Sequence, residues 1–216
     1  MHKTKGKNMK KFLLVTLLFC MGTMPAVADN YGYNSTPQRD TYVGLRLHKN
    51  DNIAFRYEPG NGDGITLRDG SFGFGAMIGN RLTDHVKIEF ETEYTYGGQS
   101  KYGNDYNFNV WANMLNVYVY QQFGGAVEPY AGLGVGISGL WGEIDGNINA
   151  SDATADMSWS IMAGVNFALN DRIDLNLGVK YQNYGDLGIS DDNGNNASIE
   201  VDGTEFYISA AYKFGL

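Results

Sequence analysis

The chain has few residues that could cross-link or kink it, since only one of its 216 residues is cysteine and only four are proline. A single thiol excludes an internal disulfide framework. Basic residues are also scarce, with 16 Lys and Arg against 24 Asp and Glu and a formal net charge of −8. Because phosphate binding needs clustered Lys and Arg, this balance argues against a nucleic-acid partner. No apolar run reaches the roughly 20 residues of a membrane-spanning helix.

The N-terminal segment has the pattern of a secretory signal peptide. A basic stretch ending at Lys11 precedes the short apolar run Phe12–Met21, and Ala26-Val27-Ala28 is a small-residue cleavage site. We therefore expect cleavage near Ala28, at the end of a signal peptide of residues 1–28. Since Cys20 lies in the removed segment, no thiol chemistry is expected of the mature chain.

Alternation with period two dominates the rest of the chain. From Val86 to Tyr96, apolar residues at most alternate positions face away from a lysine and three glutamates. A period of two predicts a strand with one apolar and one polar face. Eight segments follow this rule, and they predict an all-β fold. The segments are Val43–Leu47, Phe72–Ile78, Val86–Tyr96, Leu115–Tyr120, Ala131–Ser138, Trp159–Phe167, Ile173–Gln182 and Phe206–Phe214.

The connections between these strands alternate in length. The short ones are 80–84, 124–126 and 170–172, and the long ones, rich in Gly, Asn and Asp, are 48–70, 97–107, 142–156 and 185–203. Short turns at one end and long external loops at the other are typical of transmembrane β-barrels, whereas a soluble sandwich or lipocalin does not need this asymmetry. Without a spanning helix, a membrane protein must be a closed barrel. We predict an eight-stranded antiparallel up-and-down transmembrane β-barrel over residues 41–216, preceded by a short periplasmic lead-in, residues 29–40.

The two faces of the strands predict two sets of residues. Glycines among charges on the polar face suit the crowded lumen of a narrow barrel, where buried charges need partners. The predicted lumen polar network is Arg46, Lys87, Glu89, Glu91, Glu93, Asp174, Lys180, Glu205 and Lys213. Aromatic residues near strand ends on the apolar face are typical of girdles at membrane interfaces. The predicted aromatic girdle is Tyr94, Tyr96, Trp111, Trp141, Trp159, Tyr181, Tyr212 and Phe214.

The chain resembles the small outer-membrane barrels of the OmpX/OmpA and Opa-like families. The resemblance is carried by the signal peptide, the eight strands, the segment Pro129–Gly136, the Leu82-Thr83-Asp84 turn and the aromatic C-terminal strand. It implies a Gram-negative outer-membrane location and assembly by the barrel-assembly machinery, which reads an aromatic C-terminal residue. Here Tyr212 and Phe214 are followed by Gly215 and Leu216, which departs from that pattern.

Motifs for other chemistry are weak. The formal G-x-G-x-x-G match at Gly134–Gly139 lies within a strand and opens no helix, so it does not predict nucleotide binding. His48 and His85 are expected at opposite ends of the barrel, which argues against a metal site. If the first two strands pair, Ser71 could approach His48, as a lipid A-modifying enzyme would require. Turns at 145–149 and 191–196 offer oxygen ligands without the spacing of a calcium-binding EF-hand.

The sequence therefore predicts an outer-membrane protein with no catalytic, cofactor or metal site. Its expected role is structural or surface interaction, in envelope integrity or adhesion, through long acidic outer loops. Its expected partners are outer-membrane lipid and lipopolysaccharide, with a host or environmental ligand at the loops. A narrow ion or small-solute channel and a lipid A-modifying enzyme are the alternatives. The translation start, Met1 or Met9, stays open.

Overall fold

The computed structural model describes residues 41–59, 65–101, 104–121, 126–145, 150–190 and 196–214. The predicted signal peptide and lead-in lie outside these residues, as do 146–149 and 191–195, the centres of the two predicted oxygen-rich turns. In the described ranges, no helix has the length and hydrophobicity that a membrane span requires.

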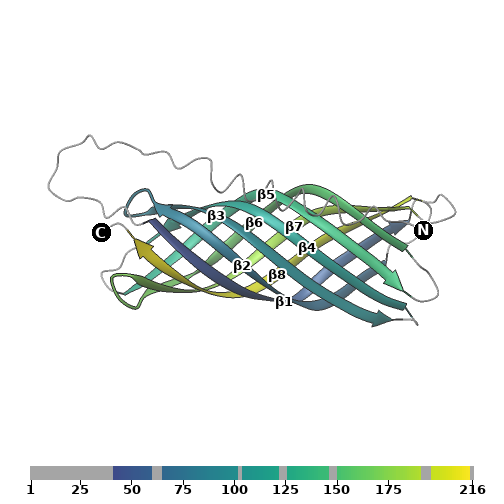
Figure 1. Cartoon of the computed structure of the whole chain (residues 1–216), viewed down its shortest axis with the longest axis horizontal. Helices are drawn as coiled ribbons and strands as arrows, with labels where there is room; N and C mark the ends of the chain where they lie inside the picture. The colour runs from purple at the N-terminus through teal and green to yellow at the C-terminus, as the bar shows by residue number, and fades with distance from the viewer. Residues whose placement is uncertain are drawn as a thin grey trace. The chain divides into compact units, whose positions relative to one another are not determined.

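Eight antiparallel strands close into a barrel in sequence order (Figure 1). Each strand pairs with its neighbours along the chain, and β8 pairs with β1, with Phe214 opposite Thr41. Closure leaves no sheet edge, so the ladder satisfies its backbone groups internally, as a membrane requires. The predicted fold class is confirmed. The strands are β1 (Thr41–Pro59), β2 (Ile65–Arg81), β3 (Val86–Lys101), β4 (Asn104–Tyr120), β5 (Val127–Asp145), β6 (Ala150–Ala168), β7 (Ile173–Ser190) and β8 (Asn196–Phe214).

The predicted short turns 80–84 and 170–172 lie where β2 joins β3 and β6 joins β7, at one end of the barrel, which we call the short-turn end. Of the third predicted turn, 124–126 between β4 and β5, residues 124 and 125 lie outside the described residues. The Thr83 hydroxyl accepts hydrogen bonds from the backbone N–H groups of His85 and Val86 at 3.2 and 3.0 Å. The Asn170 side-chain oxygen accepts equivalent bonds from Arg172 and Ile173 at 2.9 Å. Such side-chain bonds to nearby backbone groups favour tight turns. In Figure 1, the yellow arrowhead of β8 points toward this end.

A belt of exposed apolar side chains surrounds the half of the barrel nearer the short-turn end. On β5, for example, Leu133 and Val135 are 63% and 58% exposed, while the glycines between such residues face inward. The belt ends before the strands do, because Lys49 on β1 and Thr204 on β8 are the next exposed outward residues. Apolar residues outside and polar residues inside are the arrangement expected of a barrel in lipid.

The prediction of four long loops is wrong in extent. Most of residues 48–70, 97–107, 142–156 and 185–203 continue the strands, so paired strands approach within five residues of each other along the chain. Backbone pairing does not need an apolar face, and strand segments beyond the belt do not contact lipid, so their outward residues need not be apolar. Register shifts at 50–53 on β1 and 183–185 on β7 also interrupt the alternation. These extensions therefore read as loops in the sequence.

Candidate functional site: the filled lumen

Inward-facing glycines on β2 let long side chains of β1 reach across to β3. Three inward residues of β1 lie opposite glycines: Tyr42 opposite Gly79, Arg46 opposite Gly75 and His48 opposite Gly73. On the other side of β2, the same glycines lie opposite Glu89, Glu93 and Thr95 of β3. Because glycine has no side chain, the lumen above β2 is free for side chains from the neighbouring strands.

Arg46 is the centre of the first group of lumen charges. Its guanidinium lies 2.5 Å from Glu91 and 3.2 Å from Glu89, and all three side chains are buried. Tyr42 and Tyr118 donate hydrogen bonds to the two oxygens of Glu89, each at 2.7 Å. The charges are thus paired with each other, as buried charge requires, and both oxygens of Glu89 are satisfied, whereas Oε1 of Glu91 has no hydrogen-bond partner among the described residues.

Lys180 is the centre of the second group. Its ammonium lies 2.6 Å from Glu93 and 3.1 Å from Glu205. Tyr184 donates a hydrogen bond to the other oxygen of Glu205. The β7 lysine therefore ties together β3 and β8, which lie on different sides of the lumen.

The remaining predicted lumen charges lie nearer the short-turn end. Lys87 is 3.7 Å from Glu89, and its ammonium lies 4.6–5.2 Å from the ring centroids of three tyrosines, a cation–π arrangement. Lys213 pairs with Asp174 at 3.0 Å. The structure thus places all nine residues of the predicted network in ion pairs. It also contains a pair that the sequence did not indicate, Arg81 with Glu128 at 2.7 Å, because Arg81 was assigned to a turn.

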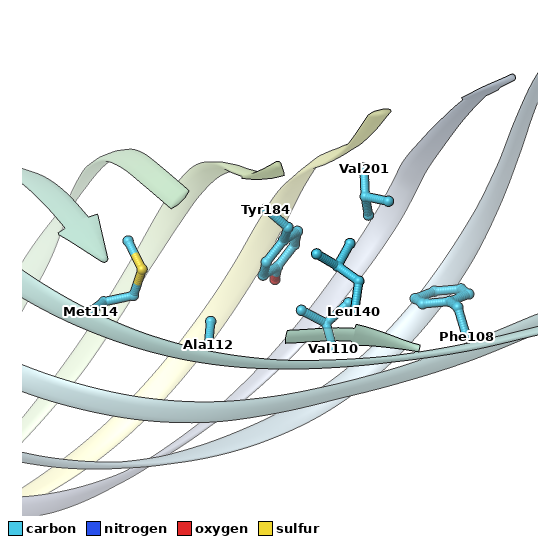
Figure 2. Close-up of a cluster of buried hydrophobic side chains, with 7 residues drawn as sticks. All are labelled: Phe108, Val110, Ala112, Met114, Leu140, Tyr184 and Val201. Atoms are coloured by element: carbon cyan, nitrogen blue, oxygen red, sulfur yellow. The ribbon is translucent and has the colours of Figure 1, made fainter. Parts of the chain in front are cut away.

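Apolar and aromatic side chains fill further parts of the lumen, for which the sequence predicted polar residues only. The cluster in Figure 2 brings together side chains from four strands. Its members are Phe108, Val110, Ala112 and Met114 of β4, Leu140 of β5, Tyr184 of β7 and Val201 of β8. A second cluster lies nearer the short-turn end. Its members are Tyr118, Tyr120, Tyr130, Met162 and Tyr207.

The residues considered for enzymatic chemistry do not form a catalytic pair. Ser71 accepts a hydrogen bond from Asn50 at 2.9 Å, whereas the His48 Nε2 atom lies 2.8 Å from the hydroxyl of Thr95. His48 was expected at the outer end of its strand, but β1 continues to Pro59, so this histidine lies inside the barrel and is 1% exposed. A nucleophile and its base need direct hydrogen-bond contact, and these two side chains have other partners.

All eight residues of the predicted aromatic girdle lie on strand positions that face outward. Tyr212 and Phe214 pack together near the short-turn end, with ring centroids 5.6 Å apart. The other six lie toward the far side of the belt, where Trp159 and Tyr181 form a similar pair at 5.6 Å. The aromatic residues therefore lie at both edges of the apolar belt, where a membrane barrel has its two interfacial girdles.

Placing a methyl group at Gly73 should destabilise the barrel by about 1–3 kcal/mol, the usual cost of overpacking. A Cβ atom there would clash with the imidazole of His48 and lie 2.5 Å from the backbone oxygen of Tyr94, which cannot move away. The measurement is urea unfolding of Gly73→Ala refolded into lipid vesicles. Gly70→Ala, on the same strand, is the matched control, since its Cβ would meet its nearest atom at 3.5 Å. Equal stabilities of the two variants would contradict this account of the lumen.

Comparisons with known proteins match this architecture. A family model described as the outer membrane protein beta-barrel domain matches residues 12–214. The outer membrane protein OprG from Pseudomonas aeruginosa is similar in structure, with a TM-score of 0.60, 17% identity and coverage of 83% of this chain and 98% of that one. Neisserial surface protein A gives a TM-score of 0.54 and 15% identity over 81% of this chain and 97% of its own. At these identities, both structures show a shared fold. No curated protein sequence matches.

Proposed function

Since the chain belongs to the family of outer membrane protein beta-barrel domains, we propose that it is a closed barrel with a structural and surface-interaction role in the outer membrane of a Gram-negative bacterium. Family membership confirms the predicted resemblance to small outer-membrane barrels. In our proposal the chain is exported through the signal peptide of residues 1–28 and cleaved near Ala28. The barrel-assembly machinery then inserts it, reading the aromatic residues of β8.

The observation that carries the proposal is the filled lumen. Ion pairs of buried residues cross the centre of the barrel, and apolar and aromatic clusters fill further parts of the lumen. A solute passing through would have to separate buried charges from their partners, which is strongly unfavourable. An eight-stranded barrel is narrow enough for side chains to fill its interior. The proposed role therefore does not include transport through the lumen. Because Ser71 and His48 have other partners, it does not include catalysis by that pair either.

The strand extensions provide the surface for interaction. The strands contain 16–19 residues, whereas crossing a bilayer takes about 9–11. The remainder continues past the apolar belt as paired β-structure, so the proposed external surface is a rigid rim rather than a set of long loops. Two of its hairpins contain most of the acidic residues. Residues 142–156 contain four acidic residues and 185–203 contain five, with no basic residue in either.

This acidic rim suggests which partners to expect. The hairpins β5–β6 and β7–β8 are neighbours around the barrel, because β6 pairs with β7. Their negative charge would repel the anionic groups of lipopolysaccharide unless divalent cations bridge them. We therefore propose a cation-dependent contact of the rim with lipopolysaccharide, or contact with a host or environmental ligand that complements the charge.

The proposal is tested by conductance across a planar lipid bilayer. The refolded wild-type chain, first shown to be folded by its shifted migration on an unboiled SDS gel, should insert without producing stepwise current. The double variant Arg46→Ala with Glu91→Ala removes a charged pair from the centre of the lumen and should produce small steps, which verifies that insertion is detected. Steps from the wild-type chain would instead identify a narrow channel.

A further inference from the structure

Three potential metal ligands meet in the lumen of the barrel. His48 of β1, Glu93 of β3 and Glu205 of β8 each offer a ligand atom, and these atoms all lie within 4.8 Å of one another. All three side chains are buried, with no more than 2% of their surface exposed. Glu93 and Glu205 lie on the two strands that flank the β1–β2 pair, and His48 lies on β1 between them. The closure of the barrel, which pairs β8 with β1, therefore brings the three together.

Local geometry explains how the three meet. His48 lies directly opposite Gly73, and a side chain at Gly73 would occupy the space of the imidazole. The ring therefore extends over β2 to Thr95 of β3, two residues from Glu93. On the other side of β1, Glu205 lies opposite Asn50, the next inward residue after His48.

Several atoms of this cluster lack partners. Among the described residues, neither the Nδ1 atom of His48 nor the Oε1 atom of Glu93 has a hydrogen-bond partner, although both are buried. The Asn50 side-chain oxygen, on the same face, also has none. Buried polar atoms without a partner need an explanation. Others occur elsewhere in the described lumen, such as Oε1 of Glu91, but here they lie beside a set of potential metal ligands. The charge is also unbalanced, since Glu93 and Glu205 share the single ammonium of Lys180.

We propose that His48, Glu93 and Glu205 bind a divalent transition-metal ion of the zinc type inside the barrel. Imidazole nitrogen and carboxylate oxygen are ligands that zinc accepts at about 2.0–2.2 Å, so ligand atoms around one ion lie roughly 3.4 Å apart. Small side-chain rotations bring atoms within 4.8 Å to that spacing. Nδ1 of His48 and Oε1 of Glu93 have no other partner and can bind the ion, which adds positive charge beside the two carboxylates.

Lys180 shares the carboxylates with the ion. Its ammonium contacts Oε2 of both Glu93 and Glu205, which orients the two groups but repels a second cation. Without Lys180, the buried carboxylates of Glu93 and Glu205 have only the metal ion to balance their charge. Removing this lysine should therefore make folding depend on the metal. The apolar and aromatic clusters that fill further parts of the lumen limit access, so the ion enters as the barrel folds and afterwards exchanges slowly.

The first experiment measures bound zinc. The full chain, without a histidine tag, is refolded in detergent with Zn²⁺, treated with EDTA, desalted and analysed by mass spectrometry for metal. The wild-type chain should retain about one zinc ion, and His48→Gln should retain about tenfold less or lower still. His85→Gln is the matched control, because this histidine lies at the exposed β2–β3 turn, and it should behave as the wild type does.

The second experiment uses a variant whose folding should require the ion. Lys180→Met leaves Glu93 and Glu205 without their cation, so it should reach the heat-modifiable, SDS-resistant form only when Zn²⁺ is present during refolding. The double variant Lys180→Met with His48→Gln should not be rescued.

Three results would overturn the proposal. The first is a wild-type chain that retains no zinc after EDTA. The second is zinc retention by His48→Gln equal to that of His85→Gln. The third is refolding of Lys180→Met that does not depend on Zn²⁺. If His48→Gln does not fold, the wild-type stoichiometry and the Lys180→Met refolding still decide the question.

Discussion

Replacing Arg46 by methionine is expected to lower the free energy of unfolding of the barrel by about 3–5 kcal/mol. Methionine keeps much of the length and volume of the side chain but removes its charge. Glu91 and Glu89 then stay buried without the guanidinium that lies 2.5 and 3.2 Å from them. The cost is the burial of uncompensated charge rather than the loss of an attraction. Urea unfolding in lipid vesicles, followed by the fluorescence of the belt tryptophans, measures it.

Two further variants separate charge from packing. The double variant Arg46→Met with Glu91→Gln should recover most of the lost stability. The Glu91 carboxylate is removed, Asn116 still has an amide to bond at this position, and Glu89 keeps Lys87 at 3.7 Å and the hydroxyls of Tyr42 and Tyr118. Arg172→Met is the matched control, since Arg172 is exposed at the β6–β7 turn and should change stability by about 0.5 kcal/mol or less. If Arg46→Met costs no more than Arg172→Met, the lumen charges are not buried as described.

The sequence was most informative where one face of a strand meets lipid. There, each outward position must be apolar, so alternation identified the eight strands and assigned Glu89 and Glu91 to the lumen without a structure. The need of buried charge for partners then predicted a paired network. The pairing of particular residues could not be predicted, because Arg46 reaches Glu91 across β2, a contact that depends on register and on Gly75.

Other features of the lumen had no signal in the sequence. Beyond the belt, neither face must be apolar, so the strand extensions of β1 to Pro59 and of β7 to Ser190 resembled loops. The same misassignment put His48 at the end of its strand, so the sequence did not predict that this histidine lies close to Glu93. The apolar cluster around Leu140 was missed for a related reason. Side chains fill a narrow lumen and exclude water whether they are polar or apolar. A search for polar inward positions therefore overlooks apolar residues that face the lumen.

Replacing Leu133 by arginine is expected to destabilise the barrel in a bilayer by about 2–4 kcal/mol, the cost of a cation at the midplane on the lipid face of a barrel. Leu133 is 63% exposed and lies on β5 between the short-turn end and Trp141, a girdle residue on the far side of the belt. Its exposed neighbours on the adjacent strands are Val117 and Ile161. In a soluble barrel, the same residue would face water, and arginine there would cost little. The substitution therefore tests which face of the sheet meets lipid.

The position of the charge along β5 provides the control. Val127 lies on the same face of the same strand at the short-turn end and is 46% exposed. Val127→Arg should cost only about 0–1 kcal/mol, because an arginine near the interface reaches water. Urea unfolding in vesicles of one lipid composition compares the two variants. A large cost at Leu133 and a small one at Val127 locate the bilayer around the middle of the belt. Equal costs would mean that depth in the membrane does not govern stability, and the exposed apolar belt would then need another partner, such as a second protein surface.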